Sequence, residues 1–179
     1  MTTAPAGRHR RGTRLLTRSW QNVRSGRSAA GIYGLLIALS VVTALSFKKE
    51  PDAGVMAAAV AATSVVFWLA HMHAHLVAEW IRTENPPTRA RVRAEGVDQL
   101  PMIVSAVPAW MILTLADLGL FSTGAAVWIV AVVSLVLLAA WGIALARAAN
   151  LGVAGAVTIA SINVGIGALI VVLKATIGH

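Results

Sequence analysis

The chain contains no cysteine and few charged residues for its length. The absence of cysteine from all 179 residues excludes disulfide frameworks, thiolate metal sites, haem attachment through C-x-x-C and cysteine nucleophiles. Charged residues make up only 12%, whereas apolar residues make up 58% and the mean hydropathy is +0.76. Water-soluble domains do not have this composition. The sequence therefore predicts an integral membrane protein.

Common catalytic motifs are also missing. The chain has no P-loop, no G-x-G-x-x-G, no H-E-x-x-H, no nucleophile elbow and no pair of acids at catalytic spacing. The polar stretches between its apolar segments are too short to fold as soluble domains. We therefore expect a protein that is not an enzyme and whose function resides in its membrane helices.

Five apolar stretches are long enough to cross a bilayer, because a helix needs about 20 residues for about 30 Å of hydrocarbon. The predicted spans are 29–47, 53–80, 100–121, 125–146 and 153–173. The polar stretch 82–99 is expected to be the one real loop. A four-span alternative would make one apolar stretch re-entrant, such as the stretch that holds Pro101 and Pro108. The predicted fold is an all-α domain of five transmembrane helices, 29–179, after a basic segment, 1–28.

Basic residues are distributed unevenly between the two ends of the predicted spans. Five spans place 1–28, 82–99 and 147–152 on one side, with seven, four and one arginines respectively. The other side holds all three lysines, which are Lys48, Lys49 and Lys174. The positive-inside rule then predicts a multi-pass protein of the cell (plasma) membrane, with its N-terminus inside and its C-terminus outside.

The segment 1–28 carries its seven arginines without any acidic residue. If 13–23 is helical, Leu16, Trp20 and Val23 recur on one face, which is typical of a short interfacial helix. Anionic lipid headgroups are therefore the expected partner of this segment. Nucleic acid is not expected, because the run leads directly into a span and lacks interleaved aromatic residues.

Small residues recur along the first and fifth predicted spans, where they would allow helices to approach closely. They are Gly31, Gly34 and Ala38 in the first span, and Ala156, Ala160 and Gly167 in the fifth. A bundle of five spans leaves little room for a pathway within one chain. We therefore expect a homo-oligomer.

Ionisable side chains inside hydrocarbon are costly and often functional. At 100° per residue, His71, His75 and Glu79 form one stripe of the span 53–80, and His73 points nearly the opposite way. Two imidazoles and a carboxylate at one-turn intervals can relay protons or bind a cation, and histidine titrates near neutral pH. The stripe predicts an inner polar site.

Two other interpretations of this stripe remain open. In the first, the histidines lie at the inner interface between Trp68 and Trp80, and Glu79 pairs with a cytoplasmic arginine, either Arg82 or Arg147. In the second, His71 and His75 bind a metal ion or haem. These two residues supply only two nitrogens. Glu79 lies about 12 Å of helix axis from His71, too far to join both histidines easily on one ion, so other helices or subunits would have to add ligands. Otherwise no cofactor is expected.

Four more polar side chains in the spans are candidate site residues: Tyr33, Ser105, Asn163 and Asp117. Tyr33 and Ser105 have inner depths that match the histidines and are expected to complete the inner pocket. Asn163 lies near the bilayer centre, where it either continues a path or bonds between helices. Asp117 lies near the outer boundary, either as an outer ion-entry carboxylate or in a salt bridge with Lys48 or Lys174.

Two segments of the chain resemble a known group of membrane proteins. Gly31-Ile-Tyr-Gly-Leu-Leu-Ile-Ala and Phe67-Trp-Leu-Ala-His, together with twelve arginines against three lysines, resemble small five-span integral membrane proteins of high-GC actinobacteria. The resemblance covers the first half of the chain and implies no activity, cofactor or site.

The polar stripe and the topology together favour a small oligomeric channel or transporter for protons or cations. In this hypothesis His71, His75 and Glu79 form the inner site and Asp117 forms an outer one. One alternative is a non-transporting membrane subunit with interfacial histidines. A metal- or haem-binding membrane protein is the other.

Overall fold

The computed structural model describes residues 9–47 and 51–177, with the side chains of 27–47, 51–173 and 176. Within these ranges the chain forms six helices and no strand, so the predicted all-α class is confirmed. The helices are α1 (His9–Leu45), α2 (Ala53–Thr83), α3 (Arg89–Asp98), α4 (Pro101–Asp117), α5 (Thr123–Ala148) and α6 (Val153–Ile177).

Local side chains explain where several helices begin. Asp52, Thr88 and Ser122 precede α2, α3 and α5, and each accepts a hydrogen bond from the backbone N–H three residues later. Such caps satisfy donors that have no partner within the helix. Glu84 ends α2 in the left-handed region, with φ of 57°, and two prolines follow it. The chain therefore turns sharply between α2 and α3.

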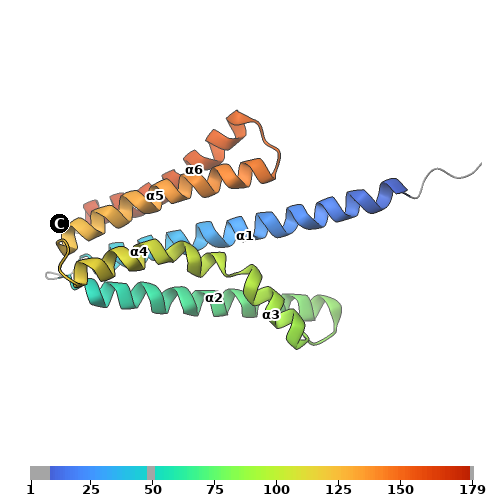
Figure 1. Ribbon diagram of the computed structural model, residues 1–179, viewed down its shortest axis with the longest axis horizontal. Helices are drawn as coiled ribbons and strands as arrows, with labels where there is room; N and C mark the ends of the chain where they lie inside the picture. The colour runs from blue at the N-terminus through green and yellow to red at the C-terminus, as the bar shows by residue number, and fades with distance from the viewer. Residues whose placement is uncertain (1–8, 48–50, 178–179) are drawn as a thin grey trace, which may run out of the picture.

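Helix α1 lies at the centre of the bundle and contacts every other helix (Figure 1). Glycine allows α1 to approach α4 closely, because a Cβ atom at Gly34 would overlap the carbonyl oxygen of Met102 in α4. A Cβ at Gly142 in α5 would likewise lie 2.8 Å from the Cα of Ala160 in α6. Small residues at these two contacts let the backbones meet, as in many membrane bundles.

An apolar core cluster occupies the half of the bundle near the turns that join α1 to α2 and α4 to α5. Its buried members come from four helices: Ala38, Val42, Ala53, Met56, Ala57, Val60, Ala106, Ala109, Leu113, Ala116, Ala126, Val127 and Val130. Toward the opposite end, the α5–α6 pair diverges from α2 and α3 (Figure 1). The charged and polar cluster described below lies at that opposite end.

Four helical segments are long and apolar enough to cross a bilayer: Arg27–Leu45, Ala53–Thr83, Thr123–Ala148 and Val153–Leu173. Helices α3 and α4 meet at a 44° bend and together make a fifth candidate. This bent pair contains the proline-bearing stretch that the four-span alternative would make re-entrant. The outward faces suit acyl chains, since large apolar side chains such as Trp128 and Val136 are more than 60% exposed.

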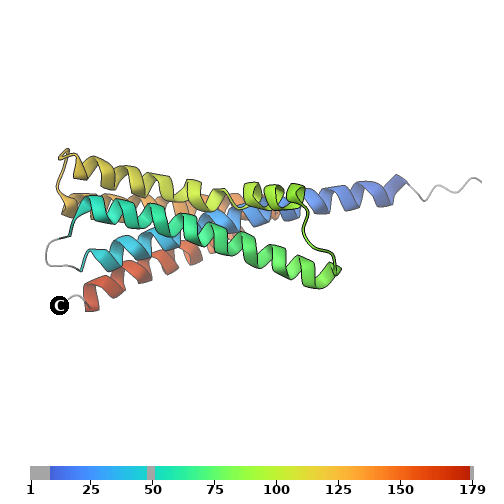
Figure 2. The same ribbon diagram turned by 90° about the horizontal axis from the view of Figure 1, so that it is seen from below.

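Two parts of the chain differ from the sequence-based expectation. The stretch 82–99, expected to be a loop, holds the last two residues of α2 and the whole of α3. Helix α1 is continuous from His9, so 13–23 belongs to the same helix as the first span and extends beyond the bundle (Figures 1 and 2). The expected apolar face of 13–23 and the lipid contacts of its arginines fall outside the described side chains.

Candidate functional site

Helix α3 turns a stripe of polar residues toward α2. Arg91, Glu95 and Gln99 are spaced four residues apart, and such residues lie on one face of a helix. Glu95 is 5% exposed and lies at the centre of the cluster. Its Oε1 accepts hydrogen bonds from His75 Nδ1 at 2.8 Å and from Gln99 Nε2 at 3.0 Å, and its Oε2 accepts one from Arg91 Nη2 at 2.8 Å.

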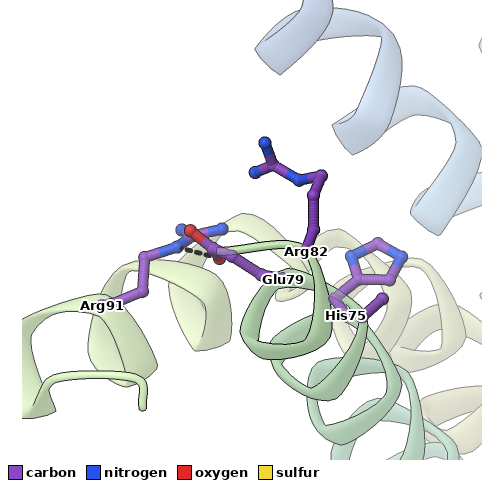
Figure 3. Close-up of a pocket in the computed structure, with 5 residues that line it drawn as sticks. His75, Glu79, Arg82 and Arg91 are labelled. Atoms are coloured by element: carbon purple, nitrogen blue, oxygen red, sulfur yellow. Dashed lines mark hydrogen bonds and ion pairs between the residues drawn. The ribbon is translucent and has the colours of Figure 1, made fainter. Parts of the chain in front are cut away.

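Arg91 joins the two acidic residues of the cluster. Its Nε donates to Glu79 Oε2 at 2.6 Å while its Nη2 binds Glu95, so one guanidinium links α2 to α3 (Figure 3). Hydrogen bonds between charged groups are stronger than neutral ones. The contacts of Arg91, together with the His75–Glu95 bond, hold α3 against the last turns of α2.

The contacts of His75 fix the position of one ring proton. A carboxylate only accepts hydrogen bonds, so His75 Nδ1 must carry a proton to bind Glu95 Oε1. The amide of Gln99 donates to the same oxygen and therefore does not need the imidazole as an acceptor. The other ring nitrogen, Nε2, takes no part in these bonds. The His75 side chain is 53% exposed, so solvent reaches the ring.

Glu95 stays ionised in this setting. Helix α3 carries five charged side chains in ten residues and is not among the four helical segments that are apolar enough to cross a membrane by themselves. Burial raises the pKa of Glu95, but the hydrogen bonds from Gln99 and His75 and the charge of Arg91 outweigh burial. The pKa of Glu95 therefore lies below its ordinary value, and the carboxylate remains a permanent partner for His75.

A line of rings leads from His75 into the bundle. The centroids of the His75 and His71 rings are 5.8 Å apart, and the His71 ring lies 4.9 Å from that of Tyr33 on α1. Tyr33 also borders a cavity of about 340 Å³ between α1 and α2. Its polar lining includes Ser40 and Thr63, which lie farther from the α3 end. The predicted grouping of Tyr33, His71 and His75 is thus present in the structure.

The other predicted site residues lie elsewhere. Ser105 is buried in the contact between α1 and α4, and its hydroxyl donates to Met102 O at 3.1 Å. Asn163 is buried between α5 and α6, and its Nδ2 donates to Leu138 O at 3.4 Å. Among the described residues, no hydrogen bond joins either residue to the histidines. Asn163 makes the interhelical hydrogen bond that its alternative interpretation expected.

Asp117 lies at the far end of the bundle, beside the N-terminus of α2. A Cβ atom at Gly54 would come within 2.7 Å of Asp117 Oδ1. A carboxylate is favoured there because the N-terminus of a helix carries partial positive charge. The 21 residues from Gly54 to His75 correspond to about 30 Å of helix. The alternative pairing of Asp117 with Lys48 or Lys174 falls outside the described side chains.

Sequence reasoning missed α3, which contributes Arg91 and Glu95 to the cluster, and Gln99, which directly follows α3. Polarity and the Pro86-Pro87 pair indicated a loop, yet the spacing of Arg91, Glu95 and Gln99 was a helical signal. Glu79 therefore pairs with Arg91, whereas the interfacial interpretation named Arg82 or Arg147.

Trp68 also has a different role from the one that the interfacial interpretation gave it. Its indole N–H donates to Gly96 O of α3 at 3.0 Å, so the ring packs beneath α3. Trp80 is 50% exposed, as a residue of an aromatic belt would be.

The metal interpretation gains no support from the described part of the chain. No three histidine, cysteine, aspartate or glutamate side chains within it converge in a metal-binding arrangement. His71 and His75 face Tyr33 and Glu95 respectively, and Glu79 is bound to Arg91. The structure thus brings no third ligand to the two imidazoles among the described residues.

No family model, curated protein or solved structure matches this chain. Its resemblance to small actinobacterial membrane proteins therefore stays a prediction.

Proposed function

We propose that this chain is a small membrane transporter or channel that moves protons or other cations, with His75 as its inner proton-binding residue. The observation that supports the proposal best is the pairing of a half-exposed imidazole with a buried carboxylate, His75 with Glu95. The carboxylate holds one ring nitrogen in place. Histidine is the side chain suited to such exchange near neutral pH.

The neighbouring rings supply the next positions for a proton. His71 and Tyr33 continue from His75 toward the cavity between α1 and α2, where Ser40 and Thr63 provide hydroxyl groups. Hydroxyls, imidazoles and water can pass protons along a hydrogen-bonded chain. On this proposal the cavity is the middle of the path and Asp117 is a carboxylate at its outer entrance.

The proposed setting is the plasma membrane, with the α3 end of the bundle inside. The turns between α2 and α3 and between α5 and α6 lie at the end from which the N-terminal part of α1 projects (Figure 1). That end also carries most of the arginines. We further propose that copies of the chain associate, because the cavity between α1 and α2 is open at the side of the monomer, where a second copy would close it.

A non-transporting subunit is the second candidate function. Glu79, Arg91 and Glu95 bind one another, as expected for a structural link that fixes α3 to α2. In this alternative the histidines only adjust that link at the membrane surface. Purified protein would then conduct no protons although its fold is intact.

Proton flux into proteoliposomes tests the proposal. A potassium diffusion potential should drive protons into vesicles that contain the purified chain and a trapped pH-sensitive dye. His75→Ala removes the exchanging imidazole and is expected to lower the initial rate at least about tenfold, in the range of typical proton-transfer effects. The measurement is the initial rate of dye response at equal protein content.

His73→Ala is the matched control, because His73 is exposed and lies on another face of α2. Its flux is expected to equal that of the unsubstituted chain. Equal flux from empty vesicles and from folded protein would overturn the transport proposal in favour of the subunit alternative. Equal flux from His75→Ala and His73→Ala would remove His75 from the path.

A further inference from the structure

A second polar feature lies on the side of α2 next to the proposed proton site. A cavity of about 360 Å³ is lined by His75, Ala78, Glu79, Arg82 and Arg91. Figure 3 shows Arg82 rising from α2 between the Glu79–Arg91 pair and His75, with no bond to either. Among the described residues Arg82 makes no hydrogen bond or ion pair, and its side chain is exposed.

Arg82 is the lining residue around this cavity that can attract an anion. Arg91 pairs with Glu79 at 2.6 Å and also with Glu95, so the guanidinium of Arg82 is the charge without a partner among the lining residues. The charges of Arg82, Arg91, Glu79 and Glu95 sum to zero while His75 is neutral, and protonation of His75 makes the sum positive. A guanidinium presents two parallel N–H groups that match the oxygens of a phosphate.

The surroundings of Arg82 also indicate where such a phosphate would come from. Ile81, directly before it, is 76% exposed, and Trp80 is 50% exposed. Exposed apolar side chains beside a cation at the end of a membrane helix suit the boundary between acyl chains and headgroups. Arg89 and Arg93 on α3 are also exposed and add positive potential at the same end of the bundle.

We propose that this cavity binds the phosphodiester headgroup of an anionic membrane lipid, with Arg82 as the main ligand. The acyl chains of the lipid would lie along Ile81 and the outer face of α2. Arg91 also borders the cavity, but its guanidinium is already bound by Glu79 and Glu95. This binding does not depend on proton transport, and a protein that fails the flux assay still retains the site.

Native mass spectrometry of the full chain tests this site. The protein would be released from nanodiscs that contain equal amounts of phosphatidylglycerol and phosphatidylcholine, and the retained lipid would be identified. The unsubstituted chain is expected to retain phosphatidylglycerol preferentially. Arg82→Gln is expected to lower that retention about tenfold, as for the loss of one charge-assisted contact.

Arg89→Gln is the matched control, because it removes an equal charge outside the cavity. We expect it to change retention less than about twofold. Equal losses in the two variants would overturn the proposal, since they would indicate only a diffuse attraction to basic residues. Displacement of the lipid by millimolar inorganic phosphate would also overturn it, by identifying a site for free phosphate. Retention that resists phosphate and is lost in Arg82→Gln supports the lipid site.

Discussion

Replacing Gly34 by alanine is expected to destabilise the bundle by about 2–3 kcal/mol, at the upper end of the usual range for overpacking. The added Cβ would overlap the carbonyl oxygen of Met102 and lie 2.6 Å from Ser105 Oγ. The first of these atoms belongs to the backbone of α4 and cannot rotate away. Helices α1 and α4 would have to separate, and α1 contacts all the other helices.

Gly165→Ala provides the control for this substitution. Gly165 lies inside α6, and a Cβ there would meet nothing within 4 Å. Alanine is a better helix former than glycine, so the free energy of unfolding should stay equal or rise slightly. Unfolding in a mixed detergent, followed by far-UV circular dichroism, compares the two variants. Equal loss of stability in both variants would show that the close approach of α1 and α4 at Gly34 does not determine the free energy of unfolding.

The sequence was informative about α1 because apolar length and small residues act locally along one helix. The stripe of Gly34 and Ala38 predicted close approach, and both residues are buried in the bundle. The sequence did not identify α4 as the partner of Gly34, because that choice depends on how five helices rotate about their axes. Helix rotation is set by side-chain packing over the whole bundle.

The polar cluster could likewise be predicted from the sequence only in part. Residue spacing placed His71 and His75 on one stripe of α2, and their rings do lie near each other. The partner of His75 comes from α3, whose polar composition and preceding prolines resemble those of a loop. This short helix is held in place by Glu79, Trp68 and His75 of α2, which are tertiary contacts. A helix of ten residues has little stability of its own in water.

Release of α3 is the expected result of Glu95→Gln. The substitution removes the buried charge that accepts hydrogen bonds from His75, Gln99 and Arg91. An amide has one acceptor oxygen, so it cannot satisfy all three donors. We expect the docking of α3 to weaken by about 1–3 kcal/mol. Hydrogen exchange of the 90–98 amides should then be about 10 to 100 times faster than in the unsubstituted chain.

Asp98→Asn is the control for this variant. Asp98 also forms an ion pair across helices, with Arg27, but the two side chains are 36% and 48% exposed. Exposed pairs contribute little to stability, so this variant should change exchange of the same amides less than about threefold. If Asp98→Asn and Glu95→Gln accelerate exchange equally, the buried carboxylate is not the residue that holds α3.

The same carboxylate predicts how docking depends on pH. A carboxyl group whose pKa is lowered in the folded state contributes stability above its unfolded pKa, near 4.3, and that stability is lost as the pH falls through the folded value. His75 cannot cause this loss, because a protonated imidazole attracts Glu95 more strongly. Protection of 90–98, corrected for intrinsic exchange, should therefore fall in acid below about pH 4 in the unsubstituted chain. It should stay low and nearly constant in Glu95→Gln, because the amide has no proton to gain over that range. An acid-induced loss of equal size in both proteins would assign the pH dependence to another carboxyl group, with Glu79 the next to test.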